Sequence, residues 1–114
     1  MYQLTLERFE QLLITRFIGD LTLHEAVDLR HQLEEIVTGE KAKDIIFDLA
    51  LVNDVDTSGL GVLVAVSTHA RAHGKRLILC RATEEVNEAL KHAALDGFFP
   101  LLEEDEDLLA MMPD

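Results

Sequence analysis

The chain has 114 residues, of which 10 are Lys or Arg and 22 are Asp or Glu, so its formal net charge is −12. This length predicts a single domain, residues 1–114, with a core large enough to fold without disulfides or a structural metal. The acidic balance argues against direct nucleic-acid binding, which depends on Lys and Arg at phosphates. It favours a basic protein partner, or serves solubility alone.

Cysteine content and hydropathy suggest a cytoplasmic protein. The single cysteine, Cys80, rules out an internal disulfide and is typical of a reducing cytosol. No stretch approaches the ~18 apolar residues that a membrane helix needs, and we expect no signal peptide and no membrane insertion. Because Cys80 ends an apolar run, we expect it to be a small buried hydrophobic residue.

The first half of the chain predicts a hairpin, a helix and a buried strand. Residues 4–6 and 12–18 have the pattern of strands, joined by a turn over residues 8–11. The segment Thr22-Leu23-His24-Glu25 has the S/T-x-x-E form of a capping box, so a helix is expected to begin there. Its apolar residues recur at helical spacing up to Gly39: Ala26, Leu29, Leu33, Ile36 and Val37. An apolar, β-branched run over residues 45–49 then predicts a buried strand.

The second half predicts two more helices alternating with strands. A helix over residues 58–73 should stop at Gly74 and carries an inward stripe of Leu63, Val66 and Ala70, flanked by Val62. A strand at 76–80 and a helix at 83–94 follow, the latter capped by Thr83 and facing inward with Val86, Leu90 and Ala94. Residues 98–102 predict a short edge strand, and residues 108–112 a final turn packed on the core after the acidic run 103–107. Strands separated by helices imply a sheet that is parallel in its middle.

The segment 54–61, between a predicted strand and a predicted helix, gathers two carboxylates, two hydroxyls and two glycines. The N-terminus of a helix carries unpaired N–H groups that stabilise anions, so a hydroxyl presented there is a candidate phosphorylation site. Asp56 or Thr57 could equally serve as the helix cap, and the residue types alone favour that interpretation.

A stripe of small residues follows on the same helix. Gly61, Ala65, Thr68 and Ala72 fall on a side different from the core stripe, and none of them is bulky. Such a face could let another protein approach closely, or it could simply be solvated. Beside a candidate phosphorylation site, it suggests a docking face.

The sequence shows no catalytic or cofactor motif. It lacks a phosphate-binding G-x-x-x-x-G-K-[ST] loop, and Ser58 lacks the G-x-S-x-G context of a hydrolase nucleophile. His69 and His73 are four residues apart, but no third metal ligand is evident, so we expect no metal and no cofactor. An enzyme-class alternative is a phospho-aspartate receiver that uses Asp48, Asp54 and Asp56, although the first strands lack the acidic pair of such domains.

The loop and its surroundings resemble a known family. Asp56-Thr57-Ser58-Gly59-Leu60-Gly61, preceded by an Ile-Ile-Phe-Asp-Leu strand, resembles the D-[ST]-S-G-L-G signature of the STAS domain, the fold of bacterial anti-sigma factor antagonists. Ile18-Gly19-Asp20-Leu21-Thr22 is similar to the turn before its first helix, and Gly74–Leu79 to its next strand. The resemblance implies a single α/β STAS-type domain with a mixed sheet and a largely parallel centre. It also implies helices packed mainly on one side, in the order β-β-α-β-α-β-α-β-α.

The resemblance further implies a regulatory binding module and not an enzyme. Unphosphorylated, it would bind an anti-sigma factor that is itself a serine kinase; the partner would phosphorylate Ser58 and so be released. The implied phosphorylation loop comprises Asp56, Thr57, Gly59 and Leu60, and the implied partner surface comprises Asp54, Gly61, Ala65 and Thr68. We expect Ser58 and not Thr57 to be modified, because Thr57 should use its hydroxyl in local backbone hydrogen bonds. The free protein is expected to be a monomer or a weak dimer.

Two departures from the family pattern leave an alternative open. Asp54 stands where the family usually has a large apolar residue, and Thr22 stands where an acidic residue is common. The alternative is a non-switching STAS subunit, attached either to a lipid-transport ATPase or to a multi-STAS signalling complex.

Overall fold

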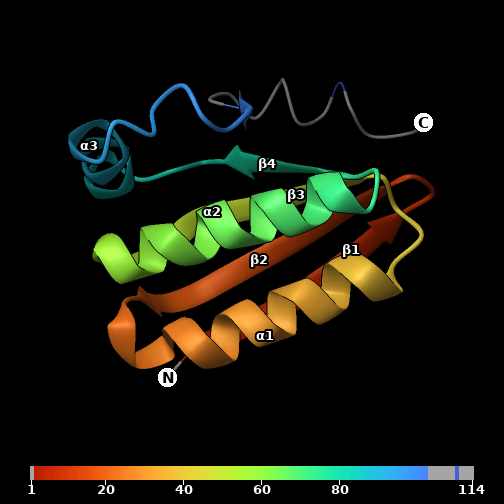
Figure 1. Ribbon diagram of the computed structural model, residues 1–114, viewed down its shortest axis with the longest axis horizontal. Helices are drawn as coiled ribbons and strands as arrows, with labels where there is room; N and C mark the ends of the chain where they lie inside the picture. The colour runs from red at the N-terminus through yellow and green to blue at the C-terminus, as the bar shows by residue number, and fades with distance from the viewer. Residues whose placement is uncertain (1, 103–109, 111–114) are drawn as a thin grey trace.

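The computed structural model describes residues 2–102 and 110, and in these residues five strands alternate with three helices (Figure 1). The elements are β1 (Tyr2–Phe9), β2 (Leu12–Leu21), α1 (Leu23–Gly39), β3 (Asp44–Val55), α2 (Thr57–Ala72), β4 (Arg76–Cys80), α3 (Glu84–His92) and β5 (Leu101–Leu102). The strands form one sheet in the order β1-β2-β3-β4-β5. β1 is antiparallel to β2, whereas the other neighbours are parallel, which confirms the predicted mixed sheet with a parallel centre.

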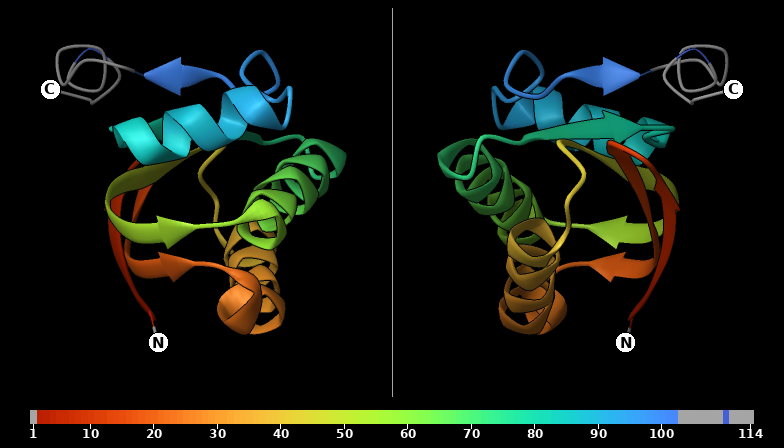
Figure 2. Two further views of the ribbon diagram at one scale, coloured as in Figure 1. Left: turned by 90° about the vertical axis from the view of Figure 1, so that its left-hand side faces the viewer. Right: turned by 90° about the vertical axis from the view of Figure 1, so that its right-hand side faces the viewer.

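The helices lie mainly on one face of the sheet. α1 and α2 run side by side across that face, and α3 lies near β4 at its edge (Figures 1 and 2). The main core fills the space between them and includes Leu29 and Leu33 of α1, Leu63 of α2 and Val86 of α3. Two predicted segments lie outside the described residues, except for Ala110. They are the acidic run 103–107 and the final turn over residues 108–112.

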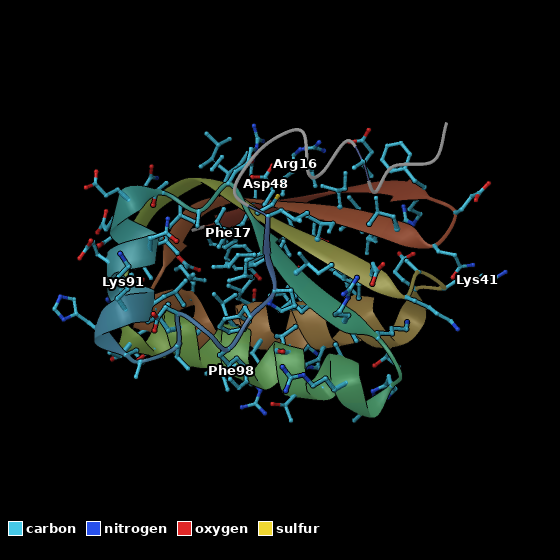
Figure 3. The ribbon with its side chains drawn as sticks, turned by 90° about the horizontal axis from the view of Figure 1, so that it is seen from above. Arg16, Phe17, Lys41, Asp48, Lys91 and Phe98 are labelled. Atoms are coloured by element: carbon cyan, nitrogen blue, oxygen red, sulfur yellow. The ribbon has the colours of Figure 1, made fainter. Side chains whose placement is uncertain are left out.

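Alternation along β2 and β3 divides their side chains between two faces, as expected for strands. Phe17 points between the sheet and the helices and meets Phe47 edge to face, with ring centroids 5.9 Å apart. Arg16 and Asp48 lie on the opposite face (Figure 3). A second, smaller apolar cluster, which includes Ile46, forms on this opposite face. The helix-side core also contains Thr15, whose buried hydroxyl has no hydrogen-bond partner among the described residues.

Several predicted boundaries are confirmed and others shift. Gly74 adopts a φ of +71° just after α2, as its predicted role as a helix stop requires. Thr83 caps α3 through a 3.2 Å bond from the Val86 N–H to its Oγ1. That helix ends at His92, however, and the prediction that Ala94 faces inward is wrong, because Ala94 is exposed with a φ of +57°.

The strands likewise differ in length from the prediction. β3 continues to Val55 and not Leu49, because it pairs with β2 along nearly the full length of that strand. The predicted edge strand is confirmed but is limited to Leu101–Leu102. Cys80, the last residue of β4, is buried as expected.

α1 and α2 run in the same direction, since each returns from the end of one of two parallel strands (Figure 1). Near the C-terminal end of α1, the Lys75 ammonium donates to the backbone carbonyls of Val37 and Glu40. A cation there is favourable because helix C-termini carry unpaired carbonyls and the negative end of the macrodipole. Within the described residues, no helix has the length and apolar character needed to cross a bilayer.

Candidate functional site

Asp56 alone connects β3 to α2, and its carboxylate serves two helices at once. Its Oδ1 accepts a 2.9 Å hydrogen bond from the Gly59 N–H in the first turn of α2. Its Oδ2 accepts a 3.0 Å hydrogen bond from the Leu23 N–H, the first residue of α1. The Asp56 N–H in turn donates to the Leu21 carbonyl at 3.1 Å, so the starts of both helices are joined at one residue.

This arrangement corrects the predicted capping box. Thr22 occupies the cap position of α1 but makes no side-chain cap hydrogen bond. In a capping box the Thr22 hydroxyl would accept from the Glu25 N–H, but that N–H donates to the Thr22 carbonyl at 3.0 Å. The first N–H of α1, that of Leu23, donates instead to the Asp56 carboxylate. The cap of α1 thus comes from a residue distant in sequence.

Asp56 is stabilised in its ionised form. The hydrogen bond from the Gly59 backbone is the largest influence and holds the pKa of the Asp56 carboxyl below its usual value. Burial opposes it, and the backbone hydrogen bonds of Leu23 and Ser58 lower the pKa further. The two positive helix ends that meet here therefore face a permanent negative charge at neutral pH. The predicted role of Asp56 as a helix cap is confirmed.

Gly59 allows the start of α2 to touch the end of β2. A Cβ atom added at Gly59 would lie 1.8 Å from the Leu21 carbonyl oxygen, far inside any tolerable contact. The next residue, Leu60, is buried in the core. Gly59 is therefore required for close packing, whereas Gly61, two residues later, has open space around it.

Ser58 and Thr57 occupy the first two positions of α2. Thr57 is exposed and Ser58 is partly exposed. Among the described residues, neither hydroxyl makes a hydrogen bond, so the expectation that Thr57 is engaged in local backbone bonds is wrong. The reason is that Asp56 already takes the cap, which leaves both hydroxyls available.

The rest of the predicted surface has the expected helix phase. Ala70 and its neighbours in the core stripe are buried, whereas Gly61 and Thr68 are exposed and Ala65 is partly buried. Asp54 is exposed at the end of β3, where it accepts a 3.0 Å hydrogen bond from the Val55 N–H. These positions lie on or directly before α2.

Sequence reasoning missed two exposed apolar residues of α1. Leu23 is 64% exposed and Val27 is 84% exposed. The sequence did carry a signal for their exposure. The predicted core stripe of α1, which includes Leu29 and Leu33, contains neither Leu23 nor Val27.

The three aspartates of the receiver alternative do not form an acidic pocket. Asp48 is only 3% exposed and lies on the sheet face opposite α1 and α2. Its carboxylate pairs with Arg81 at 2.5 Å and with Arg16 at 3.5 Å, whereas Asp54 and Asp56 lie at the far end of β3. The structure thus separates the charges that a receiver would need together.

His69 of α2 and His73, the residue that follows the helix, make hydrogen bonds within the helix layer. His69 Nε2 lies 2.8 Å from Thr38 Oγ1 of α1, and His73 Nδ1 lies 2.9 Å from the His69 carbonyl. In the part of the chain that the structure describes, no group of three or more metal-ligating side chains comes together.

Comparison with known proteins places this fold in a family. The model of the STAS domain family matches residues 3–108. The chain belongs to the STAS domain family. An anti-sigma F factor antagonist of Paenibacillus polymyxa is 24% identical to it over 107 residues, which cover 94% of this chain and 92% of the relative.

Two solved structures share the STAS fold with it. The unphosphorylated form of the anti-sigma factor antagonist SpoIIAA superposes with a TM-score of 0.75 at 19% identity, covering 98% of this chain and all of the other. The phosphorylated form of SpoIIAA from Bacillus gives a TM-score of 0.68 at 18% identity, covering 95% and 98%. The family resemblance and the fold class expected from the sequence are therefore confirmed.

Proposed function

We propose that this STAS domain is an anti-sigma factor antagonist, switched by phosphorylation of Ser58. In this proposal the unphosphorylated protein binds an anti-sigma factor with serine kinase activity in the cytoplasm. The partner transfers a phosphoryl group from ATP to the Ser58 hydroxyl and then dissociates. The STAS domain itself catalyses nothing; it is the substrate and the switch.

The observation that carries the proposal is the Ser58 hydroxyl, which is partly exposed at the second position of α2 and makes no hydrogen bond within the described chain. A hydroxyl without an internal role is free to enter a kinase active site. The related protein SpoIIAA has been solved in phosphorylated and unphosphorylated forms, which supports a phosphorylation switch for this family member.

The chemistry of the loop explains why a phosphate would act at an interface. Phosphorylation adds roughly −1.5 to −2 charges at neutral pH. The N-terminal end of α2 would attract that charge by only ~0.3–1 kcal/mol, and the ionised Asp56 two residues earlier would repel it. The modification should therefore leave the fold intact and act on whatever protein covers the loop.

Substitutions at the two hydroxyls test the proposal. With each purified kinase-type anti-sigma factor encoded by the same genome, Ser58→Ala should bind and stay bound when ATP is added. Ser58→Asp should melt within a few degrees of the wild type yet lose the complex, because its added charge lies in the interface. Thr57→Ala serves as the matched control and should remain phosphorylatable.

Calorimetry and intact-mass spectrometry with fragment spectra give the readouts. Label on Thr57 with Ser58 unmodified would contradict the proposal. A complex that forms equally well with wild type and Ser58→Asp would instead support a non-switching assembly subunit.

A further inference from the structure

Two large apolar side chains of α1 lie in solvent near the start of α2, the helix whose second residue is Ser58. Leu23 is 64% exposed and Val27 is 84% exposed, and their spacing of four residues places them on one face of the helix. The core is filled by other residues of α1, such as Leu29 and Leu33. Leu23 and Val27 thus add little to the packing of the described fold.

Contacts at both ends of α1 and α2 place these side chains along the seam between the helices. At the start, the Leu23 N–H donates to Asp56 at 3.0 Å, so the first turns of the two helices are adjacent. Farther along, Thr38 Oγ1 and His69 Nε2 are 2.8 Å apart. α1 and α2 therefore remain side by side between these two contacts (Figure 1).

Helical periodicity then relates Val27 to Ser58. Val27 precedes Thr38 in α1 by eleven residues, and Ser58 precedes His69 in α2 by the same number. Eleven residues make about three turns, so the two residues of each pair lie on the same side of their helix to within roughly 20°. Since Thr38 and His69 face each other, Val27 and Ser58 lie along the same side of the seam, within about one turn of each other.

The charge around this seam indicates what kind of protein could cover it. Asp54 and Asp56 lie just before Ser58, and the whole chain carries a net charge of −12. A second copy of this chain would bring the same carboxylates against them, and juxtaposed like charges are unfavourable. A different protein, with an apolar pocket rimmed by Lys or Arg, is complementary to this surface.

We propose that Leu23 and Val27 are the apolar anchors of the partner interface, and that the anti-sigma factor covers α1 as well as α2. The inference rests on the proposed function and extends the expected docking face, Gly61, Ala65 and Thr68, across the seam. It also explains how a phosphate breaks the complex. A dianion on Ser58 would lie at the edge of a desolvated apolar contact, where charge is most costly.

The test is the double variant Leu23→Gln/Val27→Gln, measured by calorimetry without ATP against each purified kinase-type anti-sigma factor of the same genome. Its matched control is Ile18→Gln/Leu51→Gln, because these neighbours in β2 and β3 are also large, apolar and exposed, at 37% and 55%. The α1 variant should weaken binding at least tenfold, as expected for buried anchor residues, while the control stays within twofold.

Folding and partner identity are tested separately. Thermal melting should show both double variants within a few degrees of the wild type, and the single variant Val27→Gln, at the more exposed position, repeats the test with less perturbation. Sedimentation at micromolar concentration tests whether the partner is a second copy of this chain. If the wild type forms a dimer that the α1 variant abolishes, the inference that Leu23 and Val27 bind a different protein is overturned.

The remaining outcomes separate this inference from the proposed function. If Ser58→Asp loses the complex but the α1 variant binds like the wild type, the anchor role is wrong and the switch stands. If the α1 and control variants weaken binding equally, the anchor role is also overturned. If wild type binds none of these anti-sigma factors, the proposed function fails and the inference fails with it.

Discussion

Replacing Asp56 by alanine should cost more stability than the loss of an ordinary helix cap. The carboxylate accepts one hydrogen bond from each of two helix N-termini, from Gly59 at 2.9 Å and from Leu23 at 3.0 Å. A single N-cap contributes ~1 kcal/mol, so the loss of both should lower the free energy of unfolding by about 2 kcal/mol. For a domain of this size, that corresponds to a fall in Tm of about 8 °C.

Urea and thermal denaturation followed by circular dichroism would measure the effect. Thr83→Ala is the matched control, because Thr83 caps only α3, through one 3.2 Å bond, and its loss should cost ~1 kcal/mol. Asp56→Asn keeps one carbonyl acceptor and should fall between the two. If Asp56→Ala costs no more than Thr83→Ala, the idea that one carboxylate caps both helices is refuted.

The contribution of Asp56 to the free energy of unfolding should also depend on pH, and the Asp56→Asn variant measures that dependence. Because hydrogen bonds, chiefly that of Gly59, lower the pKa of Asp56 in the folded protein, its contribution is fully present above its ordinary value of 3.8. That contribution is lost as the pH falls through the lower folded pKa. The stability difference between wild type and Asp56→Asn should therefore shrink as the pH is lowered from about 6 to below 4. A stability difference that stays constant over this pH range would contradict the conclusion that the ionised Asp56 carboxylate stabilises the fold.

Two further predictions concern single core and helix positions. Thr15→Val should raise the free energy of unfolding by ~1 kcal/mol, measured by urea denaturation, because it removes, at nearly constant volume, a buried hydroxyl that has no partner in the described part of the chain. A destabilised variant would mean that the hydroxyl has an acceptor. Gly59→Ala should cost ~1–3 kcal/mol or more, since its Cβ would lie 1.8 Å from the Leu21 carbonyl oxygen. The matched change Gly61→Ala, in open space on the same helix, should be neutral or stabilising, and equal Tm values for the two variants would refute the packing argument.

The elements that the sequence predicted well are those whose burial follows a simple period. The core stripe of α2, including Leu63 and Val66, repeats every three to four residues, and the helix phase follows from that repeat alone. The strand over Arg76–Cys80 and the cap at Thr83 are equally local, and both are confirmed.

What the sequence concealed depends on contacts between distant segments. Thr22 and Glu25 form a convincing local capping pattern, but the Thr22 side chain makes no cap hydrogen bond. The first N–H of α1, that of Leu23, donates to Asp56, which only the fold brings near. The same carboxylate leaves Thr57 without the role expected of it. The extension of β3 to Val55 likewise depends on pairing with β2, which no local pattern encodes.

Asp48 has a consequence for how the strands align as the sheet forms. It lies opposite Arg16 in β2 and Cys80 in β4, with Arg81 directly after β4. Because neighbouring side chains point to opposite faces, sliding β3 by one residue would turn Asp48 toward α1 and α2 and away from both arginines. A carboxylate buried there without its partners would cost several kcal/mol. The ion pairs of Asp48 with Arg16 and Arg81 therefore disfavour a shifted strand register. The apolar, β-branched side chains around Asp48 in β3 would not by themselves prevent such a shift.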